Sequence, residues 1–298
     1  MFVDLVESER LYSLLDGLPL AIAQAGAFLQ ESGVGLQTYL KFYERQWKEL
    51  MESRSQTEAL LQDYPGRSVW TTWAISYNAI REKDEAAANL LLLWSFLDNK
   101  DLWHGLFAEA CDASNTVARK LSEWIGDIAS NELRFAEAMQ LLRNYSLVEH
   151  VEDLASYGTH PLVHKWAYHY KGRDYCTKIA RLAVAVVGWA VPHKSRREFS
   201  TLQRRLLPHA QACSRWVLAD ELGGSIHSYD ELDSDSTEEN SEEEAILGAI
   251  NNLGILYAQE SKLGEAERMF VLALQGKEEA LGPKHISTLH AVGCLGSL

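Results

Sequence analysis

The feature that most constrains the fold of this chain is an apolar pattern in residues 245–298 that recurs after 42 positions. Five residues of the first copy are matched by identical or similar ones in the second: Ala249, Ile250, Leu253, Gly254 and Leu256 are followed by Ala291, Val292, Leu295, Gly296 and Leu298. Such a recurrence is typical of stacked helical repeats, because one helix pair cannot bury its own apolar faces. A glycine inside a helix costs about 1 kcal/mol relative to alanine, so Gly254 indicates a place where a second helix approaches closely.

The first copy also has the residue order of a tetratricopeptide repeat (TPR), L-G-x2-Y followed by A-x3-F and a further alanine. The matching residues are Leu253, Gly254, Tyr257, Ala266, Phe270 and Ala273. Over residues 253–285 the chain closely resembles TPRs of the kinesin-light-chain type. The resemblance predicts an α-α hairpin that begins a solenoid and binds a protein or peptide on its concave surface. The alternative is an ordinary amphipathic hairpin. Because only one full and one partial repeat are present, we interpret the chain as truncated relative to that family.

Motifs in the first half of the chain resemble a second family. Residues 17–21 read GLPLA, and the continuation IAQAGAFL resembles the version joined to such TPRs in fungal immune-receptor-like proteins. Further similar segments lie at residues 73–76, 91–98, 145–148 and 160–167, the last reading HPLVHKWA. In this order, the motifs resemble the C-terminal part of an NB-ARC/TPR protein, which is an NLR-like switch ATPase of the STAND class.

Helical periodicity and this resemblance together predict a mainly α fold with five parts. Two short strands, at residues 146–151 and 154–159, are expected to form a hairpin between helices, as in a winged helix. The parts are an ARC-like helical subdomain (1–65), a winged-helix-like domain (66–172), a helical connector (173–219), an acidic disordered linker (220–244) and the TPR segment (245–298). The run at residues 86–97 is apolar on all sides and predicts a fully buried helix.

The resemblance implies a nucleotide site, but the sequence lacks its main component. In NB-ARC relatives the GLPLA proline, here Pro19, lies near the adenine, and the motif histidine, here His160, reaches the phosphates of ADP. No G-x-x-x-x-G-K-[ST] loop occurs in the chain, so nothing would cradle a triphosphate or place its Mg²⁺. We therefore predict no catalytic residues, no enzymatic activity and no cofactor held by this chain, whereas its relatives use ADP or ATP with Mg²⁺.

Histidines and cysteines were also considered as site residues. His160 and His164 are four residues apart and His169 follows, but Pro161 stands where a zinc protease has its glutamate. We expect no metal site, with His164 packing or hydrogen-bonding inside the fold. The four cysteines, Cys111, Cys176, Cys213 and Cys294, include no C-x-x-C pair and are predicted to be small buried hydrophobes.

The distribution of charged residues indicates which kinds of partner the chain can bind. The net charge is −14, and nine acids fall within residues 230–244. The one basic cluster consists of Lys194, Arg196, Arg197, Arg204 and Arg205. This cluster could bind nucleic acid, which would make the chain a winged-helix regulator. We favour the alternative that the cluster is a solvated helix face or pairs with the acidic linker.

The apolar runs and the N-terminus indicate where the protein resides. The longest apolar runs, at residues 86–97 and 182–191, are too short to span a bilayer, and the N-terminus lacks a signal peptide. We expect a soluble, cytoplasmic protein that contacts no membrane. Its predicted function is protein-protein interaction and conformational control. In full-length relatives, nucleotide exchange is associated with self-association.

Overall fold

The computed structural model describes residues 2–52, 64–151, 155–170, 173–193, 196, 198–218 and 236–298. Within these residues the fold is mainly α-helical, as predicted. The helices are α1 (Phe2–Leu14), α2 (Pro19–Ser32), α3 (Leu36–Glu52), α4 (Tyr64–Lys83), α5 (Glu85–Trp94), α6 (His104–Ala113), α7 (Asn115–Ile125), a 3-10 turn η1 (Gly126–Ile128), α8 (Glu132–Asn144), α9 (Pro161–His169), α10 (Arg173–Trp189), α11 (Phe199–Leu218), α12 (Ser236–Gln259), α13 (Leu263–Leu281) and α14 (Ile286–Gly296).

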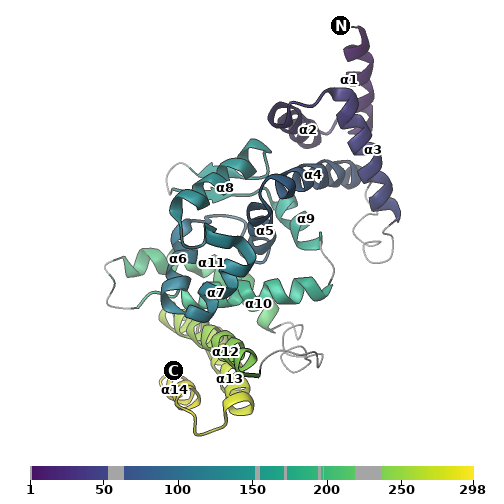
Figure 1. Ribbon diagram of the computed structural model, residues 1–298. Helices are drawn as coiled ribbons and strands as arrows, with labels where there is room; N and C mark the ends of the chain where they lie inside the picture. The colour runs from purple at the N-terminus through teal and green to yellow at the C-terminus, as the bar shows by residue number, and fades with distance from the viewer. Residues whose placement is uncertain are drawn as a thin grey trace.

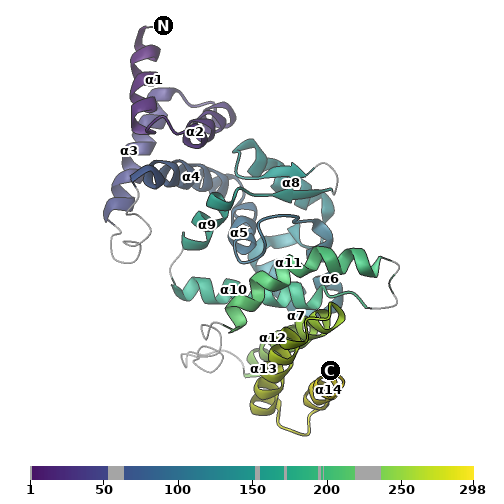
Figure 2. The ribbon, with the colours of Figure 1, turned by 180° about the vertical axis from the view of Figure 1, so that it is seen from behind.

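The helices are arranged along one long direction, with the chain termini toward opposite ends (Figure 1). Helices α1 to α3 form one end, and α12 to α14 form the other. Helix α4 connects the first end to the middle, because it packs on α2 and α3 and also on α5. The view from behind shows α10 and α11 between the central helices and the α12–α13 pair (Figure 2).

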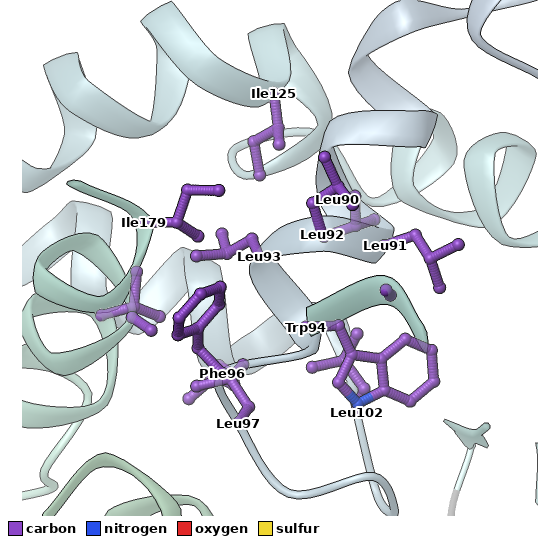
Figure 3. Close-up of a cluster of buried hydrophobic side chains, with 14 of the residues drawn as sticks. Leu90, Leu91, Leu92, Leu93, Trp94, Phe96, Leu97, Leu102, Ile125 and Ile179 are labelled. Atoms are coloured by element: carbon purple, nitrogen blue, oxygen red, sulfur yellow. The ribbon is translucent and has the colours of Figure 1, made fainter. Parts of the chain in front are cut away.

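Helix α5 is the centre of the largest core. Asp84 caps its N-terminus by accepting a hydrogen bond from the backbone N–H of Ala87 at 3.0 Å. Every residue from Leu90 to Trp94 is at most 1% exposed, which confirms the predicted buried helix in this part. The helix ends at Trp94 rather than at residue 97, and Ala86 and Asn89 are only half-buried. Ile125 of α7 and Ile179 of α10 close over it (Figure 3).

The predicted hairpin is present but shorter than expected. Strands β1 (Glu149–Val151) and β2 (Ser156–Gly158) are antiparallel, with His150 opposite Tyr157. Leu102, in the loop between α5 and α6, forms an additional bridge to Tyr157. The hairpin therefore pairs with a segment that lies far earlier in the chain.

The prediction of an acidic disordered linker over residues 220–244 is wrong at its C-terminal end. Helix α12 begins at Ser236, so residues 236–244 are helical, and residues 220–235 lie outside the described residues. Bases from two other helices pair with acids in this first part of α12. Glu242 lies 2.5 Å from Lys120 of α7, and Glu243 lies 2.7 Å from Arg181 of α10. Paired acids of this kind lose the mutual repulsion that would keep them apart in an isolated segment.

Candidate interaction site

The predicted TPR residues form the interface between α12 and α13. A Cβ added at Gly254 would lie 2.6 Å from the ring of Phe270, so only glycine permits this approach. Ala266 and Ala273 are fully buried on the facing helix, and so is Leu253. Gly276 of α13 likewise lies where the two helices approach closely, because an added Cβ would lie 2.4 Å from the side chain of Leu247 in α12.

Tyr257 connects this hairpin to the preceding helices. It is 1% exposed, and its hydroxyl lies 2.7 Å from the hydroxyl of Ser214 in α11. Burial raises the pKa of Tyr257, and the hydrogen bond with Ser214 opposes that effect. Tyr257 therefore fills space within the hairpin, as predicted, and also joins it to the connector, which the sequence did not indicate.

A groove opens between α12, α13 and α14 and has a volume of about 570 Å³. Its walls are Ile255, Ala258, Gln259, Phe270, His290, Gly293, Cys294, Ser297 and Leu298. Ile255 and Ser297 occupy equivalent positions in the 42-residue recurrence, so the groove lies on the same side of both repeat units. Phe270 and Leu298 are apolar repeat positions in the sequence and Cys294 was expected to be buried, but the sequence did not indicate that they line a groove. The recurrence could have paired Ile255 with Ser297.

The groove is held rigidly to the rest of the molecule through α10. A Cβ at Gly188 would lie 2.4 Å from the carbonyl oxygen of Ala249, which shows how closely the two backbones approach. The indole N–H of Trp189 donates a 2.8 Å hydrogen bond to the carbonyl of Ala245. Together with the Glu243–Arg181 ion pair, these contacts fix the direction of α12 against α10.

The two residues predicted to contact nucleotide lie at the starts of different helices. Pro19 is exposed in the first turn of α2, which packs on α4 and α8. His160 is exposed and caps α9, because its Nδ1 accepts the backbone N–H of Leu162 at 3.2 Å. Helix α9 packs on α5. The ring of His160 therefore already has a structural partner on one side.

The other histidines considered are part of the fold. His164 is half-buried, and its Nε2 lies 3.1 Å from the carbonyl oxygen of Trp94. Burial lowers the pKa of His164, and the hydrogen bonds to the carbonyls of Trp94 and Leu97 only partly offset this. Burial also lowers the pKa of His169. Among the described residues, no three His, Cys, Asp or Glu side chains are grouped as a metal site would require.

Of the three described residues of the basic cluster, Arg196 and Arg205 pair with acids, and neither acid belongs to the acidic linker. Arg205 makes two hydrogen bonds to the carboxylate of Asp101, at 2.7 and 2.9 Å, and lies 4.0 Å above the ring of Trp103. Arg196 pairs with Glu109. Arg204 is exposed, whereas Lys194 and Arg197 lie outside the described residues. The acids of α12 contact α7 and α10 instead.

Across the described ranges, no helix combines the length and the apolar character needed to cross a bilayer.

Comparison with known proteins supports the TPR assignment and a wider similarity. Residues 246–287 match the tetratricopeptide repeat family, which confirms the predicted repeat. Over 292 residues, or 95% of this chain, the sequence is 24% identical to a protein of Hyaloscypha variabilis described as a nucleotide-binding leucine-rich repeat (NLR)-like protein. The chain spans 25% of that relative's length. No solved structure shows a significant match. The chain thus carries a tetratricopeptide repeat and is similar over nearly its whole length to part of an NLR-like protein.

Proposed function

We propose that this chain is a non-catalytic interaction and regulatory module, and that the groove between α12, α13 and α14 binds a segment of a partner protein. The groove itself carries the proposal. It has the volume of a ligand site and is built on a matched TPR, an architecture whose stacked helices create concave binding surfaces.

The lining indicates the chemistry of the bound segment. None of the lining residues is an acid, a lysine or an arginine, and the polar groups are the side chains of Gln259, Ser297, His290 and Cys294. Phe270, Ile255 and Leu298 supply apolar surface. Such a groove suits a neutral or apolar segment with a few hydrogen-bonding groups, since charged side chains would lose hydration there without gaining a partner.

The regulatory part of the proposal rests on how the groove is attached. The close approach of Gly188 to Ala249 and the Tyr257–Ser214 hydrogen bond make α10, α11 and α12 move as one body. A movement of the central helices would therefore carry the groove with it. In longer relatives this coupling would connect ADP- or ATP-controlled oligomerisation to the binding of a partner. By the same analogy, the α5–α9 region with its hairpin serves as the winged-helix part of the switch, and α1 to α3 as the ARC part.

Pro19 and His160 do not make a nucleotide site on their own. They lie on helices that pack against different neighbours, and Nδ1 of His160 is engaged in the α9 cap. The phosphate-binding loop is absent from the sequence. In this proposal the chain neither hydrolyses nor holds ATP, and any contribution of the two residues requires a nucleotide core supplied by another segment.

The nucleic-acid alternative has less support. Arg205 and Arg196 already neutralise Asp101 and Glu109. A phosphate backbone would have to compete with these carboxylates, which leaves Arg204 as the described member of the cluster with no ion pair to an acid among the described residues.

A matched pair of variants tests the proposal. Ala258→Arg places a cation and a long side chain in the groove, whereas Gln275→Arg adds the same charge at an exposed site on α13 that does not line the groove. A partner identified by affinity capture with the intact chain should be lost with Ala258→Arg and kept with Gln275→Arg. Equal binding by both variants would place the interaction elsewhere on the molecule.

A further inference from the structure

One wall of the groove contains a cysteine whose surroundings differ from those of the other cysteines. Cys294 is half-buried on α14 and lines the groove. His290 lies one turn earlier on the same helix, with its two ring nitrogens 3.8 and 3.9 Å from the sulfur. Both nitrogens are near the thiol, so a small rotation of the ring lets either one receive its proton.

The amide of Asn251 reaches the same sulfur from α12. Its Nδ2 donates to Sγ of Cys294 at 3.8 Å, and Asn251 is only 2% exposed. Within the described residues, Oδ1 of Asn251 is buried without a hydrogen-bond partner. Rotated by half a turn, the amide would offer this oxygen to the S–H group, while the present orientation offers N–H to a thiolate. Asn251 can therefore serve both protonation states of Cys294.

A buried lysine completes the cluster. Lys277 of α13 is 2% exposed, and its Nζ donates to the carbonyl of Ser287 at 3.4 Å. Burial lowers the pKa of Lys277, whereas negative charge at Cys294 and Glu244 raises it. Lys277 thus places an amine at the start of α14, the helix that carries Cys294. Reactive cysteines characteristically lie in partly exposed surroundings close to basic side chains.

The other described cysteines provide internal comparisons. Cys111 is also half-buried, but burial and then the neighbouring Asp112 raise its pKa. Cys213 is fully buried, and burial raises its pKa strongly. Cys176 donates to the carbonyl of Tyr168 at 3.7 Å. Cys294 differs from these three in facing both an amide donor and an imidazole.

We propose that Cys294 is the reactive thiol of this chain, that it forms mixed disulfides with low-molecular-weight disulfides, and that the attached group then closes the groove. The thiolate sulfur attacks one sulfur of the incoming disulfide. One S–S bond breaks and one forms, so Cys294 is oxidised while the other half of the reagent leaves as a thiolate. The proton given up by Cys294 passes to His290 and then to the departing thiolate. A groove of about 570 Å³ is large enough to hold a tripeptide-sized group.

The first experiment measures reactivity and requires no partner protein. The folded full-length chain is treated with oxidised glutathione, and the modified cysteines are mapped by mass spectrometry over time. We expect Cys294 to react about 10-fold or more faster than Cys111 and Cys213. His290→Gln, a change at an exposed position, should slow Cys294 without changing the rate at Cys111. Equal rates at Cys294 and Cys111, or an unchanged rate in His290→Gln, would overturn the proposal.

The second experiment tests closure of the groove and rests on the proposed function. Chain thiolated at Cys294 should lose the partner that Ala258→Arg loses, and thiol reduction should restore binding. In the Cys294→Ser variant, treatment with the disulfide should leave binding at the level of the same variant before treatment, whatever that level is. If Cys294 reacts selectively but thiolation leaves binding intact, the result disproves closure of the groove and still supports the reactivity of Cys294. If no partner uses the groove, the proposed function fails but the mapped rates are unaffected.

Discussion

At the scale of single residues, a few polar side chains attach α11 to the loop between α5 and α6. Arg205 makes two hydrogen bonds to the carboxylate of Asp101 and stacks on the ring of Trp103. His209 is fully buried, with Nδ1 accepting the N–H of Asp98 at 3.2 Å and Nε2 lying 3.2 Å from the carbonyl of Asp101. These partners require the neutral tautomer that carries its proton on Nε2, because only an N–H can donate to the carbonyl.

His209 therefore gives folding stability a pH dependence of defined sign. Burial lowers the pKa of His209, and the positive charge of Arg205 lowers it further. The hydrogen bond to the carbonyl of Asp101 and the negative charges of Asp98 and Asp101 raise this pKa, but only partly offset the lowering. In the unfolded chain the imidazole titrates near pH 6.5. Below that pH the unfolded state binds more protons than the folded state. The stabilisation from neutral His209 is thus complete above about pH 6.5 and is lost as the pH falls toward the lower folded pKa.

We expect His209→Gln to be more destabilising at pH 7.5 than at pH 5.5, because the wild type loses this contribution in acid. Urea unfolding of wild type and variant at both pH values measures the difference. The exposed His150→Gln provides the control and should show the same small effect at both. An effect of His209→Gln that did not depend on pH would contradict the assignment of a neutral, buried imidazole.

Another residue-scale prediction concerns the ion pair at the start of α12. The side chains of Glu243 and Arg181 are 12% and 18% exposed, whereas that of Glu242 is 35% exposed. Glu243→Gln leaves a largely desolvated guanidinium without its carboxylate and should lower the free energy of unfolding by about 1–3 kcal/mol. Glu242→Gln should cost less than about 1 kcal/mol, because its ion pairs are exposed to solvent. Equal losses in urea denaturation would show that burial does not distinguish these two pairs.

At the scale of elements, the contact between α10 and α12 depends on the absence of a side chain. Gly188→Ala would raise the helix propensity of α10 by about 1 kcal/mol. The new methyl would nevertheless lie 2.4 Å from the carbonyl oxygen of Ala249, and a backbone atom cannot rotate away. We expect a net loss of about 1–3 kcal/mol, measured by chemical denaturation.

Gly26→Ala is the matched control for that substitution. Gly26 lies inside α2, and an added Cβ would meet nothing within 4 Å. The same chemical change should therefore stabilise the protein, by up to about 1 kcal/mol. If both alanine variants shifted stability in the same direction, propensity rather than helix approach would dominate at Gly188.

At the scale of the whole molecule, α14 presents a face that its repeat equivalent buries. Leu289 and Val292 are 57% and 47% exposed, whereas the residues 42 positions earlier, Leu247 and Ile250, are buried against the fold. Ile286 is 84% exposed on the same helix. Exposed apolar surface of this kind favours association, and repeat arrays need a polar outer face at their ends.

We expect Leu289→Lys to reduce self-association in light scattering, and an appended polar capping helix to do the same while raising the melting temperature. Leu133→Lys, at a position 68% exposed on α8, is the control and should leave association unchanged. An equal effect of the two lysine substitutions would indicate that added charge, rather than the α14 face, governs association.

The intact chain should also bind ADP only weakly. One apolar contact from Pro19 and one hydrogen bond from His160 amount to roughly 2–3 kcal/mol before the cost of association. A millimolar complex requires about 4 kcal/mol. Titration calorimetry should therefore detect no ADP binding tighter than about 1 mM, and no ATP hydrolysis should be measurable. Micromolar affinity for ADP would refute both the incomplete site and the non-catalytic function.

Features of the structure that depend on near neighbours follow from the sequence alone. The largely apolar run at residues 86–97 predicts a buried helix, and α5 is buried from Leu90 to Trp94. The spacing of Gly254 and Phe270 predicts two closely packed helices. Periodicity records which face of a segment is apolar, and a cap or a glycine acts within a few residues of its own position. Helix α7 carries such a signal too, because its buried residues Val117, Leu121 and Ile125 are four apart.

Which distant side chains meet depends on how the helices pack in three dimensions. Glu242 and Glu243 of α12 are paired because α7 and α10 bring Lys120 and Arg181 to them from more than sixty residues earlier. Tyr257 bonds to Ser214, and Cys294 lies beside Asn251, because α11 and α12 place those partners there. Local patterns carry no information about such approaches, since ion pairs, hydrogen bonds and grooves depend on distances that arise only when whole helices pack.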